Sequence, residues 1–146
     1  MHTKLAGSIR HFTDLKVWEK AHCLFLAILD AIEEFPTRRS ATLLAEQLVR
    51  SAGSVCANIA EGFNRSRRKF VNSLDIALGE ANEAENRLYK ARDAGFMAPE
   101  TAKQRLLAVI EIEKMLTGLR SAIAANENAL RESGGEYLAE PSAGEP

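Results

Sequence analysis

The sequence predicts an all-α protein, an antiparallel up-down-up-down four-helix bundle. Four long segments place apolar residues at alternating spacings of three and four, and they are rich in Ala, Leu, Glu, Arg and Lys, which favour helices. No stretch alternates apolar and polar residues as a half-buried strand does. Pro36 and Pro99 separate the periodic segments, whereas Pro141 and Pro146 lie in a polar tail.

The length of 146 residues fits a single domain. We expect a flexible N-terminal arm at 1–13, the four-helix bundle at 14–126 and a disordered acidic tail at 127–146. The two cysteines suit a reducing compartment, no apolar run is long enough to cross a membrane, and the first residues lack the apolar stretch of a secretory signal. The sequence therefore predicts a cytoplasmic protein without membrane contact.

The first helix is expected from about Asp14, as its N-cap, to Phe35, because Pro36 disfavours helical geometry in the residue before it. Two adjacent apolar seams run along this segment. One seam comprises Leu15, Trp18, His22, Phe25, Leu29 and Ile32, and the other Val17, Ala21, Leu24, Ile28, Ala31 and Phe35. Two seams predict wide burial, either deep in the bundle or also against another subunit.

The second helix follows a turn at 36–40 and is expected to end near Gly62, as its left-handed C′ residue. Its small residues at 51–54 include Gly53, whose helix cost a close neighbouring helix would offset. Ser66 is expected to cap a third helix over 67–94, which Gly95 ends in the same way. Pro99 suits the first turn of a fourth helix that reaches about residue 126.

The residues that usually carry catalysis are sparse. Glu19 and His22 have the Glu-x-x-His spacing of di-metal bundles, but the sequence holds no second copy of this unit. His22 and Cys23 are adjacent and therefore point about 100° apart on a helix. No nucleophile elbow, phosphate-binding loop, dinucleotide fingerprint or CxxC is present. We expect no catalytic residue, no metal and no cofactor.

The net charge of −1 hides two segments of opposite sign. Residues 37–70 hold seven cations and two acids, a charge of +5, and residues 126–146 hold one cation and five acids, a charge of −4. The cluster at 65–69 opens the third helix, where positive charge opposes the helix dipole, so helix stability does not explain it. The candidate residues for binding nucleic acid or another anion are Arg38, Arg39, Arg50, Arg65, Arg67, Arg68 and Lys69. The alternative is a solvated charge run, or ion pairs with the acids of a partner subunit.

Several segments together resemble a known family. They are Asp14-Leu15-Lys16-Val17-Trp18, Phe35-Pro36, Gln47-Leu48-Val49-Arg50-Ser51-Ala52, Asn58-Ile59-Ala60-Glu61-Gly62 and Arg65-Ser66-Arg67-Arg68-Lys69-Phe70. This combination resembles the bacterial four-helix bundle proteins encoded in intervening sequences of large-subunit ribosomal RNA genes. That family is similar in fold to the accessory variability determinant of diversity-generating retroelements. One departure is Cys56, where the family often has proline.

The resemblance implies a homopentameric ring or barrel without enzymatic activity. For the retroelement relative it implies a basic surface that contacts reverse transcriptase and RNA. For Asn58 and Glu61 we expect a buried hydrogen-bond network or a subunit contact, the alternative being a polar functional site.

Two hypotheses for function follow. In the first, a non-enzymatic homo-oligomer, expected to be a pentamer, binds RNA or a nucleic-acid enzyme through basic helix ends. In the second, the protein is a scaffold for protein contacts with no nucleic-acid role. A small metal-dependent enzyme is a distant third.

Overall fold

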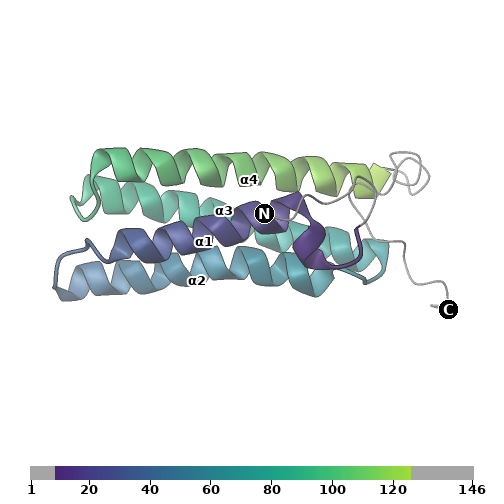
Figure 1. Cartoon of the computed structure of the whole chain (residues 1–146), viewed down its shortest axis with the longest axis horizontal. Coiled ribbons are helices and arrows are strands. Elements are labelled where there is room, and N and C mark those ends of the chain that lie inside the picture. The colour runs from purple at the N-terminus through teal and green to yellow at the C-terminus, as the bar shows by residue number, and fades with distance from the viewer. Residues whose placement is uncertain (1–8, 126–146) are drawn as a thin grey trace.

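The computed structural model describes residues 9–125, which form a short 3-10 turn and four α-helices (Figure 1). The turn η1 spans Phe12–Asp14, and the helices are α1 (Lys16–Ile32), α2 (Arg39–Gly62), α3 (Arg67–Asp93) and α4 (Pro99–Ala125). No strand occurs in this part of the chain. The all-α class and the four-helix bundle are therefore confirmed. Of the expected arm at 1–13, residues 1–8 lie outside the described residues and residues 12 and 13 belong to η1, and the expected tail at 127–146 also lies outside.

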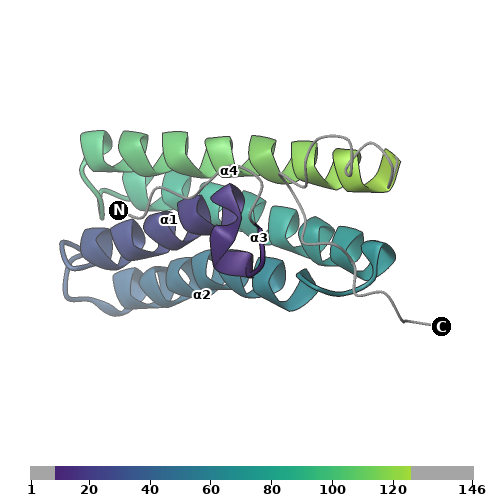
Figure 2. The same ribbon diagram turned by 45° about the vertical axis from the view of Figure 1, so that its right-hand side comes forward.

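Cross-helix contacts set the register between neighbours. α3 packs along both α2 and α4, and α1 lies against α2 and α4. Between α2 and α3, Arg50 pairs with Glu83. Gly62, which follows Arg50 on α2, contacts Ser73, which precedes Glu83 on α3. Between α4 and α1, Lys20 pairs with Glu111, and Arg105 donates to the carbonyl oxygen of the later Ala27. The α1–α2 and α3–α4 connections lie at one end of the bundle and the α2–α3 connection at the other (Figures 1 and 2).

Small side chains line the inner face of α3 and let its neighbours come close. Four fully buried alanines repeat along this face, at positions 77, 81, 84 and 91. On α2, a Cβ added to Gly62 would lie 2.5 Å from the Cβ of Ser73, closer than any real contact. Gly53 on α2 sits against the ring of Phe25, where an added Cβ would lie 3.4 Å from the ring carbon Cε2. The close helix approach is therefore seen at Gly62, whereas at the small-residue cluster Gly53 faces an aromatic ring.

Two details of the chain reversals correct the sequence analysis. The prediction that Gly62 is the left-handed residue is wrong, because the left-handed backbone falls on Asn64, with φ 65°. Gly62 is instead required by the contact with Ser73. The same prediction for Gly95 is confirmed, with φ 75°.

The first helix is shorter at both ends than predicted. Asp14 does not cap it, because its carboxylate accepts hydrogen bonds from the backbone N–H groups of Arg10 and His11 and so completes the 3-10 turn. At the other end, the N–H groups of Glu33 and Glu34 bond to carbonyls three residues earlier. This tightening ends α1 at Ile32, ahead of Pro36.

The two apolar seams of α1 are buried to different extents. Val17, Ala21, Leu24, Ile28 and Ala31 are buried in the core. The seam that contains Trp18, Phe25 and Leu29 faces outward beyond its first residue and is only partly buried. The bundle alone therefore satisfies one of the two predicted seams.

Aromatic contacts join the two connections at one end of the molecule. Phe96, in the α3–α4 connection, is 8% exposed, and its ring centroid lies 5.9 Å from that of Phe35 in the α1–α2 connection. The guanidinium of Arg38 lies 4.9 Å from the Phe96 ring centroid, a cation–π contact. Both connections are thus held by one buried ring.

The Gly62–Ser73 contact yields a stability prediction with a matched control. Gly62→Ala is expected to lower the free energy of unfolding by about 1–3 kcal/mol, because the new methyl group overlaps the Ser73 Cβ. Gly79→Ala, on the exposed side of α3 with nothing within 4 Å of the new Cβ, is expected to raise it by up to about 1 kcal/mol. Urea unfolding checks both, and shifts of the same sign would contradict the close approach.

Candidate nucleic-acid interface

The structure divides the seven candidate cations among three places. Arg65, Arg67, Arg68 and Lys69 lie at the α2–α3 connection, and Arg38 and Arg39 lie at the opposite end, beside the start of α2. Arg50 lies in the middle of α2. The sequence grouped these residues by charge, but the fold brings only the first four together.

The α2–α3 connection is a fixed turn. Phe63 is 6% exposed and packs edge-to-face on Phe70, with ring centroids 6.4 Å apart. Asn64 reverses the chain, and the Ser66 hydroxyl caps α3 by accepting a 3.4 Å hydrogen bond from the Lys69 N–H. The backbone that carries the cluster is thus anchored on both sides.

The side chains of this turn remain available to a ligand. Arg65, Arg67, Arg68 and Lys69 are all exposed, and none of them forms an ion pair within residues 9–125. We call these four residues the α2–α3 cation cluster. Four unpaired cations within five residues produce a strong local positive field, which favours a polyanion.

The cations at the opposite end are more engaged with the protein. Arg38 is held over Phe96, and Arg92 pairs with Asp93 at 2.8 Å. That hydrogen bond keeps the pKa of Asp93 below its usual value. Arg39 is exposed at the first position of α2. This end therefore offers less free positive charge than the α2–α3 cation cluster.

Arg50 is paired within the protomer. Its guanidinium lies 3.3 Å from Glu83 and 3.7 Å from Glu80 on α3, and Arg87 also pairs with Glu83, at 3.2 Å. The sequence did not identify this cross-helix ion pair, because it depends on the register between α2 and α3. Arg50 therefore links two helices and lies apart from both basic ends.

Asn58 and Glu61 do not form a buried network in the described protomer. The amide of Asn58 donates a 2.8 Å hydrogen bond to the carbonyl oxygen of Ser54, within its own helix. Glu61 is exposed, without a side-chain hydrogen bond or ion pair inside residues 9–125. Of the two predicted structural roles, a contact between subunits is the one that this geometry leaves open.

A carboxyl pair on the α3–α4 side was only partly visible in the sequence. Burial, and then the neighbouring Glu85 carboxylate, raise the pKa of Glu113 to about 7. Tyr89 donates a 2.9 Å hydrogen bond to Glu85, and this bond raises the pKa of Tyr89. One oxygen of Glu113 is buried without a hydrogen-bond partner in the described chain. The spacing of Glu85 and Tyr89 by four residues was readable, but their approach to Glu113 depends on helix register.

Four further chemical features of the described residues concern metal ligands, His22, Cys56 and membrane spans. The described residues contain no group of three or more His, Cys, Asp or Glu placed to hold a metal ion. The ring of His22 stacks on Trp18, with centroids 4.8 Å apart. Burial raises the pKa of the Cys56 thiol to about 11, so this cysteine is a poor nucleophile at neutral pH. Among the helices of residues 9–125, none has the length and apolar character that a membrane span needs.

The fold and the surface define a small helical-bundle protein with a dense group of exposed cations at its α2–α3 connection. The chain belongs to the family of 23S rRNA-intervening sequence proteins, whose family model matches residues 13–118. This confirms the resemblance to the intervening-sequence proteins, whereas the likeness to the retroelement determinant stays a prediction.

A solved structure supports the same assignment. The chain is similar to a Bacteroides thetaiotaomicron protein of the S23 ribosomal protein family, which is described as having unknown function. The match has 28% identity and a TM-score of 0.66, and it covers 71% of this chain and 97% of the other. No curated protein matches the sequence.

The carboxyl pair predicts a pH-dependent stability. A carboxyl whose pKa rises on folding, here from 4.5 to about 7, makes the protein less stable as pH rises through that interval. Glu113→Gln is expected to reduce this fall, measured as the difference between urea midpoints at pH 5 and pH 8. Glu100→Gln, an exposed carboxyl change on the same helix, is expected to leave it unaltered. An equal fall in wild type and Glu113→Gln would contradict the assignment.

Proposed function

We propose that this protein is a non-enzymatic homo-oligomeric module that binds RNA through the α2–α3 cation cluster. In this proposal the protomer is an antiparallel up-down-up-down bundle, and five protomers form a ring. The observation that carries the proposal is the set of four exposed cations on an anchored turn, none of which forms an ion pair within residues 9–125. The family name refers to 23S rRNA, which makes RNA the first ligand to test.

The cluster has the chemistry of phosphate recognition without base reading. Arginine and lysine contacts to phosphates supply affinity that depends on salt and is largely independent of sequence. The only aromatic residues next to the cluster, Phe63 and Phe70, are buried and pack on each other, so they offer no platform for base stacking. We therefore expect backbone contacts with RNA.

The assembly part of the proposal is supported by the outward seam of α1. Trp18, Phe25 and Leu29 lie on one outward stripe, where Trp18 and Phe25 are half-buried and Leu29 retains 37% of its accessible surface. A second protomer would bury this stripe, and a ring would gather several copies of the cation cluster on one assembly. The order of five comes from the family resemblance. Both cysteines are free, which supports a cytoplasmic location.

A protein scaffold is the second candidate function. The same apolar stripe favours it, because protein contacts alone would explain the stripe, and the cations could then pair with the acids of a partner. The two functions differ in their response to salt, since release of counterions from RNA gives a steep dependence.

The first test concerns RNA affinity. Arg65→Gln, Arg67→Gln, Arg68→Gln and Lys69→Gln together are expected to weaken binding to a mixed RNA pool. If all four contact single-stranded phosphates, the slope of log affinity against log salt should fall by up to about 3. The matched control removes Arg38, Arg39, Lys90 and Arg92 from the opposite end and should change the slope less. Unchanged affinity and slope in the first variant would favour the scaffold.

The second test concerns the assembly. Light scattering is expected to give a solution mass near that of five chains for the full-length protein. The mass of a single chain would contradict the ring and leave the outward seam of α1 without an occupant.

A further inference from the structure

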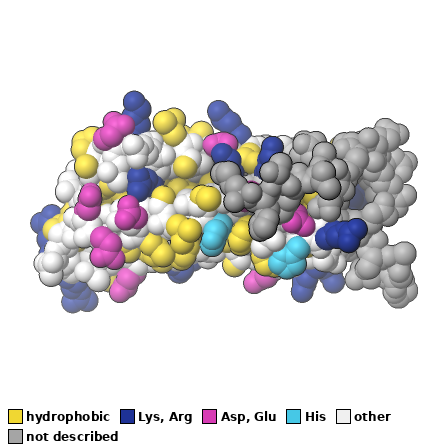
Figure 3. All heavy atoms as spheres, in the orientation of Figure 1, with side chains coloured by type: hydrophobic (Ala, Val, Ile, Leu, Met, Phe, Trp, Pro, Cys, Tyr) yellow, Lys and Arg dark blue, Asp and Glu magenta, His cyan; other side chains and the backbone are white. Residues whose placement is uncertain are grey.

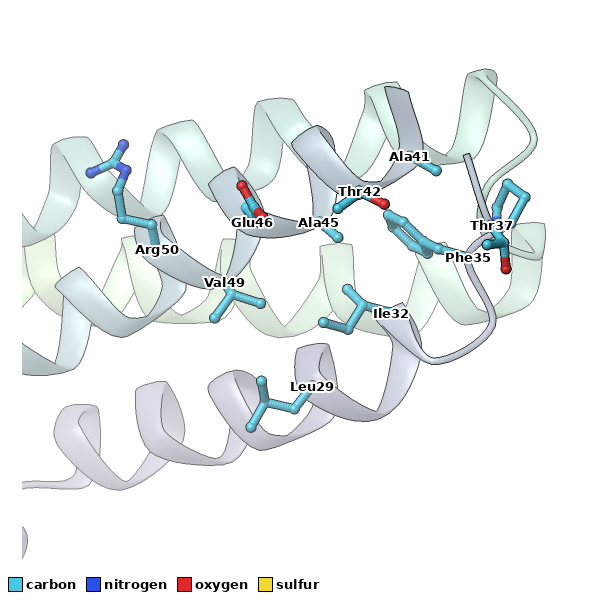
Figure 4. A pocket seen from close by; sticks show the side chains of 11 residues that line it. Leu29, Ile32, Phe35, Thr37, Ala41, Thr42, Ala45, Glu46, Val49 and Arg50 are labelled. Carbon is cyan, nitrogen blue, oxygen red and sulfur yellow. The ribbon is translucent and has the colours of Figure 1, made fainter. Parts of the chain in front are cut away.

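An apolar strip runs along α1 and α2 on the face in view in Figure 3. Towards the end where α1 stops, it widens into an open cavity of about 640 Å³, lined by Leu29 and Ile32 of α1 and by Ala45 and Val49 of α2 (Figure 4). Beyond the cavity, the ring of Phe25 packs against Gly53, and the stacked rings of His22 and Trp18 follow on α1, so the apolar surface continues as a strip along this helix. We call this surface the α1–α2 groove.

Acidic side chains flank the wide end of the groove. Glu46 lines the cavity from α2, and Glu33 follows the last turn of α1. Both are exposed, and neither forms an ion pair within the described chain. Figure 3 shows several acidic side chains gathered at this end of the face. An occupant of the groove should therefore carry an apolar side chain with a cation beside it.

The outer face of α4 has this combination. Leu107 is 61% exposed, the highest value among the exposed large hydrophobic residues of the described chain. Lys103 and Lys114 lie four residues before it and seven after it, on the same helix face. Both lysines are exposed and form no ion pair inside residues 9–125. The chain thus carries both a groove and a complementary ridge, on different helices.

The α1–α2 groove and the outer face of α4 also lie at matching levels along the bundle axis. Lys20 faces Glu111 and Ala27 faces Arg105, so Leu107 is level with Phe25, and Lys103 with Leu29. Because Gly53 meets Phe25, Glu46 lies about two helical turns beyond the level of Phe25 and about one turn beyond that of Leu29. A second copy standing alongside in the same orientation would bring its Leu107 to the groove. Its Lys103 would then be within side-chain reach of Glu33 and Glu46.

We propose that the α1–α2 groove of one copy receives the outer face of α4 from a second copy, with Leu107 in the groove and Lys103 beside Glu33 and Glu46. This inference rests on the homo-oligomeric part of the proposed function and names its interface. The contact joins two different patches and is therefore heterologous, and it forms a ring when the rotation between neighbouring copies closes. All copies then point the same way, and their α2–α3 cation clusters lie on one rim.

Light scattering over a range of concentrations tests the interface. Leu107→Ser is expected to raise the concentration at which the assembly dissociates at least tenfold, since it removes the apolar side chain that enters the groove. Ile76→Ser, which alters a 46% exposed residue on α3, is the matched control and should leave dissociation unchanged. Because Leu107 is mostly exposed, circular dichroism should show full helicity in both variants.

A charge exchange tests the register independently of folding. Lys103→Glu alone, and Glu33→Lys with Glu46→Lys, should each weaken the assembly, and the three changes combined should restore it. A wild-type assembly that tolerates Leu107→Ser and both charge variants would overturn this interface but leave homo-oligomerisation standing. A wild-type protein with the mass of one chain would overturn both. A monomer that associates only after residues 127–146 are removed would show that the chain's own tail occupies the groove, which also overturns the proposal.

Discussion

The close approach of α2 to α3 is the constraint on which the rest of the structure depends. It requires Gly62 opposite Ser73 and a row of buried alanines on α3, because larger side chains would force the helices apart. Small residues leave little apolar surface to bury. Larger side chains fill the core between these small contacts, among them Phe70, Leu74 and Leu88 of α3 itself. On α1 one apolar seam joins this core, and the other faces outward.

The same packing determines which charges are free. Along the α2–α3 contact, Arg50 and Arg87 are used to pair with Glu80 and Glu83. At the α2–α3 connection the chain reverses over Phe63 and Asn64, and the four cations there form no ion pair with an acid of residues 9–125. A nearly neutral protein can therefore present a strongly positive connection. Net charge alone would have concealed it, since the opposite charge is placed elsewhere in the sequence.

Local sequence signals predicted the helices well but not the contacts between them. Ser66, Gly95 and Pro99 act on their immediate backbone, so the ends of α3 and the start of α4 were foreseen. Gly62 was misread because its role depends on Ser73, which lies on another helix. Asp14 was misread because two N–H groups before it were equally able to use its carboxylate.

The same distinction holds for the candidate site. The dense cation cluster is evident from the sequence of residues 65–69. The structure adds that its members form no ion pair within residues 9–125. The raised pKa of Glu113 could not be predicted, because it depends first on burial between helices and then on a carboxyl 28 positions away in the chain, at Glu85. Arg105 is similar, since its guanidinium donates to the Ala27 carbonyl oxygen of α1. Predicting contacts of this kind requires the register between helices. Helical periodicity in the sequence predicts only which face of each helix is buried.

The buried ring of Phe96 has a consequence for how the protein can change in evolution. It touches both Phe35 and Arg38, so the α1–α2 and α3–α4 connections depend on each other's length. An insertion in either connection would separate the Phe96 ring from Phe35 and Arg38. The α2–α3 connection has exposed residues at Asn64 and Arg65 and no second loop to match. Length variation among relatives should therefore accumulate there, where it also alters the spacing of the cations.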